Sequence, residues 1–205
     1  MRNRRPWDLM LPPRGQSGFS LPEMLAVLAI IGATAAIGVF SISNGAWRTS
    51  SAASELARQL EFARSRATFE DHDYRVLFDT AAESFQVHSD LNSNGAVNPE
   101  LNEEVRQNPL SRSGSQVVFG FVAGTAGLDG TTITSAVSFP GSPPAITFRP
   151  IGTATEGVIY LIPREDLDRG DPSHMRAISV VQATGRVRRW RYFPNSGGPG
   201  PWRLE

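Results

Sequence analysis

Residues 18–40 have the sequence GFSLPEMLAVLAIIGATAAIGVF, and the uncharged part of this stretch decides the topology of the chain. From Met24 to Ile42 there is no charged residue over about 19 positions, close to the roughly 20 apolar residues that cross a bilayer as a helix. Small residues interrupt the run, as is common where membrane helices pack against one another. We therefore predict a membrane-spanning helix over residues 19–43.

The basic flank of this helix predicts its orientation. Four arginines precede the apolar run: Arg2, Arg4, Arg5 and Arg14. Positively charged flanks stay on the cytoplasmic side, so we expect a cytoplasmic N-terminus and export of the residues after about 43. A secretory signal peptide is an alternative, because the triplet Ala33-Thr34-Ala35 imitates a cleavage site. Glu23 argues against it, since an unpaired carboxylate in lipid costs about 3 kcal/mol.

The residues around Glu23 resemble a known processing signal. GFSLPEMLAVLAIIG is similar to the class III signal of type IV prepilins and type II secretion pseudopilins. The resemblance implies a leader peptide over 1–18, cleavage between Gly18 and Phe19, and N-methylation of Phe19. It also implies a single-pass inner-membrane protein with a periplasmic head, processed by a prepilin peptidase and N-methyltransferase.

The same resemblance gives Glu23 a role in assembly. A free amine at Phe19 and the Glu23 carboxylate are both costly in lipid when unpaired. Pairing the amine of one subunit with Glu23 of its neighbour satisfies both charges and fixes their register. The expected partners are therefore other pseudopilins or pilins. Pro22 is tolerated in the first helical turn, because its missing N–H would have no partner there.

The exported part, residues 44–205, begins with a second helical pattern. Apolar residues recur at helical spacing up to about residue 70 and form one stripe: Ala53, Leu56, Leu60, Ala63 and Ala67. This predicts one long helix over about 20–70, whose second half lies on a sheet. Asn44-Gly45 is the expected soft point, since glycine costs about 1 kcal/mol in a helix.

Seven short β-branched or aromatic runs follow the helix and predict strands. They cover residues 74–78, 84–88, 116–119, 145–148, 157–162, 177–181 and 186–192. Residues 120–144 predict a long loop or irregular hairpin, and residues 194–201 a turn-rich tail. The expected fold is α+β and pilin-like, with a long N-terminal helix, transmembrane in its first half, packed on an antiparallel sheet.

Three blocks of the head are similar to the GspH/FimT family of pseudopilins. They are residues 63–67, residues 145–153, and residues 178–181 together with 184–188. The resemblance implies an H-type minor pseudopilin that takes part in assembly or capping of a type II secretion pseudopilus. A free periplasmic binding protein, a third class, needs neither Glu23 nor Pro22.

The C-terminal charge pattern predicts a second possible function. Residues 70–104 carry nine acidic residues against one arginine, whereas residues 176–205 carry six arginines against one glutamate. Four of these arginines lie in the run GRVRRWR: Arg186, Arg188, Arg189 and Arg191. Arginines beside an aromatic ring can contact phosphates and stack on a base. The alternative function is therefore that of a FimT-like minor type IV pilin that binds DNA for transformation. The competing explanation is a hairpin whose arginines pair with acidic residues of a neighbour.

Enzymatic chemistry is not expected. The chain has no cysteine, and its three histidines, His72, His88 and His174, have no metal-ligand spacing. Asp90-Leu-Asn-Ser-Asn-Gly95 imitates the start of a calcium loop, but Leu101 stands where the closing acid belongs. Such Asx-Gly sequences also form turns without metal. We therefore expect no cofactor, no metal site and no catalytic residue.

Overall fold

The computed structural model describes residues 20–42, 45–110, 116–194 and 200–205. The chain separates into two compact units, residues 1–42 and 43–205, and each is described by itself. The predicted leader, including Gly18, and the predicted mature N-terminus at Phe19 lie outside the described residues.

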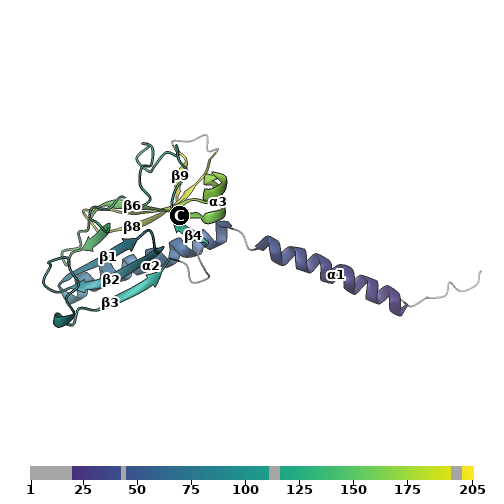
Figure 1. The fold of residues 1–205 in the computed structure, drawn as a ribbon, viewed down its shortest axis with the longest axis horizontal. Helices are drawn as coiled ribbons and strands as arrows, with labels where there is room; N and C mark the ends of the chain where they lie inside the picture. Colours follow the sequence, from purple (N-terminus) through teal and green to yellow (C-terminus); the bar gives the residue numbers. More distant parts are fainter. Residues whose placement is uncertain (1–19, 43–44, 111–115, 195–199) are drawn as a thin grey trace, which may run out of the picture. The chain divides into compact units, whose positions relative to one another are not determined.

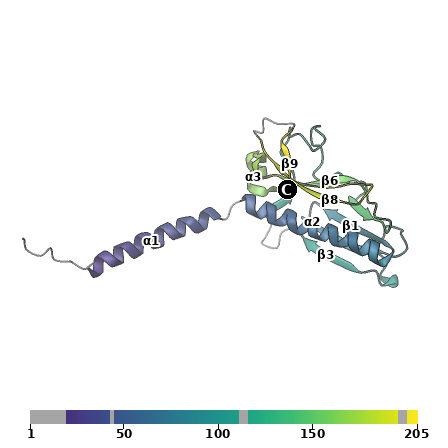
Figure 2. The ribbon, with the colours of Figure 1, turned by 180° about the vertical axis from the view of Figure 1, so that it is seen from behind.

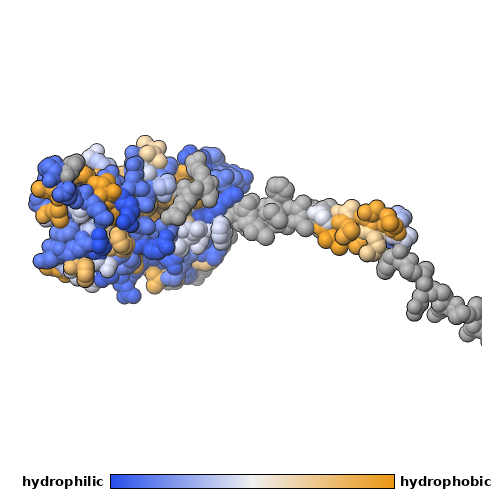
Figure 3. Space-filling view, turned by 90° about the horizontal axis from the view of Figure 1, so that it is seen from below, coloured by the Kyte–Doolittle hydropathy of each residue, from blue (hydrophilic) through white to orange (hydrophobic). Residues whose placement is uncertain are grey.

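The first unit contains one helix, α1 (Leu21–Ile42). Its described apolar side chains are exposed between Leu21 and Ile31, with exposed fractions from 44% to 75%, and they form a hydrophobic surface in Figure 3. Among the helices of the described residues, none has the length and apolar character that membrane crossing requires. The predicted span also includes residues 33–42, whose side chains lie outside the described residues.

The second unit is built on α2 (Gly45–Glu70), which packs against two antiparallel sheets. In Figure 1 strands β1 to β3 lie in front of α2, and Figure 2 shows the same helix from its exposed side. The buried stripe of α2 is made mostly of alanines around the fully buried Leu56 and Leu60. Small side chains allow the helix to approach the sheets closely, and each buried leucine contributes about 2 kcal/mol.

The first sheet has the strand order β3-β2-β1-β5. Its strands are β1 (Asp73–Asp79), β2 (Ser84–Asp90), β3 (Val105–Pro109) and β5 (Ala145–Phe148). Alternation places Val76 of β1 and Val87 of β2 opposite each other on the face toward α2. Arg75 and His88 are paired on the other face.

The second sheet has the order β4-β6-β7-β8-β9. Its strands are β4 (Val117–Phe119), β6 (Gly157–Pro163), β7 (Arg176–Val180), β8 (Val187–Tyr192) and β9 (Trp202–Leu204). Three short helical segments complete the fold: α3 (Arg164–Arg169), η1 (Pro99–Leu101) and η2 (Pro172–His174).

An aromatic cluster joins the two sheets. The rings of Phe78 in β1 and Phe139 in the 120–144 segment are stacked with centroids 5.9 Å apart, and Phe119 of β4 meets Phe78 edge-on. A Cβ atom at Gly157 would lie 2.5 Å from the Phe139 ring, so only glycine fits at this position. The segment 120–144, predicted as a long loop or irregular hairpin, therefore supplies part of the core.

The structure confirms the α+β class and the seven predicted strands, with small shifts at their ends. The predicted long helix is described as two helices, α1 and α2, which end and begin on either side of residues 43–44, beside the predicted soft point. Strands β3 and β9 were not predicted. Strand β3 is nearly all exposed and has no apolar alternation, and β9 is only three residues long.

Candidate functional site

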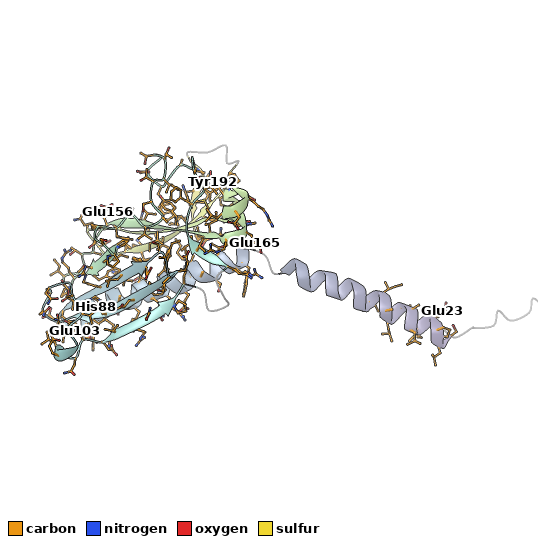
Figure 4. All side chains as sticks on the ribbon, viewed as in Figure 1. Glu23, His88, Glu103, Glu156, Glu165 and Tyr192 are labelled. Atoms are coloured by element: carbon orange, nitrogen blue, oxygen red, sulfur yellow. The ribbon has the colours of Figure 1, made fainter. Side chains whose placement is uncertain are left out.

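The predicted assembly residue Glu23 closes the first turn of α1 (Figure 4). Its Oε2 atom accepts hydrogen bonds from the backbone N–H of Ser20 at 3.3 Å and from the Ser20 hydroxyl at 3.4 Å. The Ser20 carbonyl in turn accepts from the backbone N–H of Glu23 at 3.0 Å. The bond from the Ser20 N–H to the Glu23 side chain is one half of a capping box, the half in which an acidic residue three positions later satisfies a free N–H group at a helix start.

These bonds hold an acidic side chain in the first turn of α1, at the positive end of its dipole and four residues after the predicted mature N-terminus at Phe19. The Ser-x-x-Glu spacing that signals it is present in the sequence, but the sequence interpretation assigned Glu23 only to subunit pairing. The two roles are compatible, because a carboxylate has more acceptor positions than Ser20 uses.

The four predicted basic residues lie on and beside β8, but not on one face. Arg189 and Val187 point toward α2, where the Arg189 guanidinium donates to the Ser54 hydroxyl and the Val187 N–H donates to Glu61. Arg188 is exposed on the opposite face, and Arg186 is exposed just before the strand. Arg191 stacks on the Phe193 ring, 4.8 Å from its centroid.

A groove of about 470 Å³ runs between α2 and β8 and collects three of these arginines. Arg58 of α2 joins Arg186, Arg188 and Arg189 along it, and two carboxylates are also present, Glu61 and Glu205. Three apolar residues also line the groove: Ala57, Val187 and Leu204. Because cations outnumber carboxylates here, the groove favours an anionic partner.

The sequence of the chain matches two family models. The model of the type II transport protein GspH matches residues 52–185, which is more than half of the chain, and the model of the prokaryotic N-terminal methylation motif matches residues 13–39. The chain belongs to the GspH family. It is a minor pseudopilin of type II secretion and a structural subunit, not an enzyme. The methylation motif implies a prepilin that is anchored in the inner membrane and processed by a prepilin peptidase.

Two solved structures are similar to this GspH-family chain. The minor pseudopilin EpsH from the type 2 secretion system of Vibrio cholerae has a TM-score of 0.46 and 13% identity, over 70% of this chain and 97% of that one. The type IV minor pilin FimU of Pseudomonas aeruginosa has a TM-score of 0.41 and 16% identity, over 68% and 85%. The assignment to the GspH family rests on the family-model match and not on these two structures. Among curated proteins, no sequence matches the chain.

In the loop that follows β2 and resembles the start of a calcium site, the buried carboxylates bond to backbone N–H groups of the same loop. The two carboxylate oxygens of Asp90 accept the N–H groups of Asn94 and Gly95, at 3.0 and 2.7 Å. Those of Glu103 accept from Leu91 and Asn98, at 3.1 and 2.6 Å. Among the described residues, no group of three acidic, histidine or cysteine side chains is placed to hold a metal ion.

Beside this loop lies a buried histidine, His88, for which the sequence predicted no role. His88 is fully buried on the side of β2 that faces away from α2, and among the described residues neither ring nitrogen has a hydrogen-bond partner. Figure 4 shows His88 and Glu103 at the same end of the sheet. Burial lowers the pKa of His88, and the neighbouring Arg75 guanidinium lowers it further against the opposing charges of Asp90 and Glu103. Alternation in β2 indicates the face of His88, but not that this face is buried.

Proposed function

We propose that this minor pseudopilin is cleaved between Gly18 and Phe19, is anchored by residues 19–43 with its head in the periplasm, and joins the pseudopilus through Glu23. In the assembled filament, the Phe19 amine of one subunit pairs with the Glu23 carboxylate of its neighbour. The observation that carries the proposal is the pair of bonds from Ser20 to the Glu23 carboxylate, which holds that carboxylate at the start of α1. The exposed apolar surface of α1 supports a lipid environment or neighbouring helices around it.

The test uses a substitution that separates capping from charge. Glutamine can replace glutamate in a capping box, but it carries no negative charge. Glu23→Gln should therefore preserve the start of α1 and membrane insertion, while crosslinking to other pseudopilins falls strongly. Intact mass of the wild-type protein extracted from membranes should show a chain that starts at N-methyl-Phe19. Normal crosslinking of Glu23→Gln would show that capping alone is required, and the pairing mechanism would be wrong.

DNA binding by Arg186, Arg188, Arg189 and Arg191 stays a prediction. Exposure of Arg186 and Arg188 supports it. Two features weaken it: Arg189 is held by Ser54, and the carboxylates of Glu61 and Glu205 line the same groove, where they repel phosphate. Arg191 is engaged with a ring of its own chain.

A further inference from the structure

Trp47, in the first turn of α2, is the one exposed tryptophan among the described residues. It is 70% exposed, whereas Trp202 is buried, and Trp190 is half-buried and donates to the Ser179 hydroxyl. Trp47 lies two positions before the buried Thr49, which places it about 200° around the helix axis from that residue. The indole therefore lies on the face of α2 that is turned away from the sheets, where no described element of the head covers it.

The residue next to Trp47 supplies a positive charge. Arg48 is the only charged residue between Ile42 and Glu55. It is half-buried, and its guanidinium forms no hydrogen bond or ion pair within the part of the chain that the structure describes. Arginine forms charge-assisted hydrogen bonds with phosphate, and anionic lipid attracts a cation that lies close to the membrane surface. The stretch 43–54 contains no carboxylate, so its own sequence does not oppose such a contact.

The surface beside Trp47 is close to neutral. The start of α2 lies against the start of α3, because a Cβ atom at Gly45 would be 3.0 Å from the Pro163 ring. The nearby Asp166 is buried and bonded to the His174 ring at 2.7 Å. The exposed charged residues of α3 are two of each sign: Arg164, Arg169, Glu165 and Asp168. This end of the head therefore carries little net charge that would repel anionic headgroups.

The length of chain after α1 limits how far Trp47 can be from the predicted span. Trp47 comes five positions after Ile42, the last residue of α1. Five residues reach at most about 18 Å even when fully extended. The polar layer on each side of a bilayer is about 5–7 Å thick. Trp47 is therefore within reach of the membrane interface for any arrangement of the two units of the chain.

We propose that Trp47 and Arg48 anchor the head to the periplasmic headgroup layer of the inner membrane. The indole ring lies among the headgroups, where its apolar body is covered and its N–H finds an acceptor, and the Arg48 guanidinium bonds a lipid phosphate. Tryptophan is enriched at membrane interfaces for this reason. The inference rests on the proposed anchoring by residues 19–43 and adds a lipid contact of the head. Because the partner is lipid, the contact belongs to the membrane-resident subunit and is lost when that subunit enters a filament.

The test measures how deep Trp47 lies in a bilayer. The full chain is reconstituted into vesicles of phosphatidylethanolamine and phosphatidylglycerol whose acyl chains are brominated either next to the headgroup or near the methyl end. Bromine quenches tryptophan fluorescence only at short range, and every protein carries Trp7→Phe so that no tryptophan precedes α1. Quenching should be stronger with bromine next to the headgroup. Trp47→Leu should reduce this quenching at least twofold, whereas Trp190→Phe, which removes an indole from the sheet, should keep it.

A charge reversal tests the part of Arg48. Arg48→Glu should weaken the quenching of Trp47, and the effect should be larger with phosphatidylglycerol present than in phosphatidylcholine alone, which has no net surface charge. Arg149→Glu is the matched control, because Arg149 is exposed and far along the chain from the span, and it should quench as the wild type does. Thermal unfolding of each variant should follow the wild-type curve.

Two results would overturn the inference. The first is equal quenching in the wild type and in Trp47→Leu. The second is that a photoreactive residue at position 47 crosslinks in cells to another pseudopilin and not to phospholipid, since the exposed indole would then serve a protein contact. Protease protection of the same vesicles keeps the two proposals apart. A chain that spans the bilayer with Trp47 unquenched removes only this inference, whereas a chain that does not span the bilayer removes the proposed anchoring as well.

Discussion

Arg176 and Glu205 form an ion pair, with 3.0 Å between Nε and Oε1, that joins the first residue of β7 to the residue after β9. The Arg176 side chain is only 4% exposed, and burial lowers its pKa although Glu205 opposes this. Strand β9 is three residues long, so backbone pairing alone holds it weakly. The ion pair and the buried Trp202, whose indole N–H donates to the Ala126 carbonyl at 2.8 Å, fix β9 to the sheet.

The first prediction concerns this pair. Glu205→Gln leaves the buried Arg176 charge without a counterion, so the free energy of unfolding should fall by about 3 kcal/mol. Urea unfolding followed by tryptophan fluorescence measures the change. Glu165→Gln, in an exposed pair with Arg169 on α3, is the control and should cost at most about 0.5 kcal/mol. Equal effects in the two variants would show that Arg176 does not depend on Glu205.

The second prediction concerns pH and His88. Because the pKa of His88 is lowered in the folded protein, the unfolded chain takes up a proton first as the pH falls below about 6.5. Stability contributed by neutral His88 is therefore complete above that pH and is lost as the pH falls through the folded pKa. His88→Leu should flatten the decrease of the melting temperature between pH 6.5 and about 5, relative to the wild type.

The control for this measurement is His72, which is only half-buried and bonds the Glu70 carbonyl. The slope of His72→Gln shows what the loss of a histidine that is not fully buried does by itself. If His88→Leu kept the wild-type slope, another group would be responsible for the acid sensitivity.

The third prediction tests DNA binding against the salt dependence of phosphate contacts. If Arg186 and Arg188 bind DNA, the logarithm of the affinity should fall with the logarithm of the salt concentration by about 0.9 per phosphate contact. Replacing both by Gln should then lower that slope by about two, with little change in thermal stability, because neither residue supports the fold. Fluorescence anisotropy with labelled duplex DNA and the full chain in detergent measures both quantities. Absence of binding at low salt would remove this function.

The fourth prediction concerns the contact between Gly157 and the Phe139 ring. Gly157→Ala places a methyl group 2.5 Å from that ring, so it should destabilise the head by about 1–3 kcal/mol. Phe139→Leu alone should also destabilise the head, since Phe139 stacks on Phe78. The double variant should cost less than the sum of the two single variants, because the smaller side chain leaves room for the methyl group. Strict additivity in a double-mutant cycle would contradict the contact.

The sequence alone determined the features that depend on local or periodic chemistry. The uncharged run up to Ile42, the Gly18-Phe19 to Glu23 spacing and the alanine-leucine stripe of α2 specify helices and a processing signal without any long-range contact. Strands with β-branched alternation, such as β1 and β6, were predicted for the same reason. The capping role of Glu23 was also present in the Ser-x-x-Glu pattern.

Only the tertiary structure decided how residues far apart in the sequence meet. The burial of His88 depends on what packs on its face of β2, and the separation of Arg189 from Arg188 depends on α2 lying against one face of β8. Strand β9 is joined to β7 by the ion pair of Glu205 with Arg176, which lies 29 positions earlier in the chain. The sequence pattern predicts on which face of a strand a side chain lies, but it does not predict which element packs against that face. That packing determines which side chains are buried and which charges are paired.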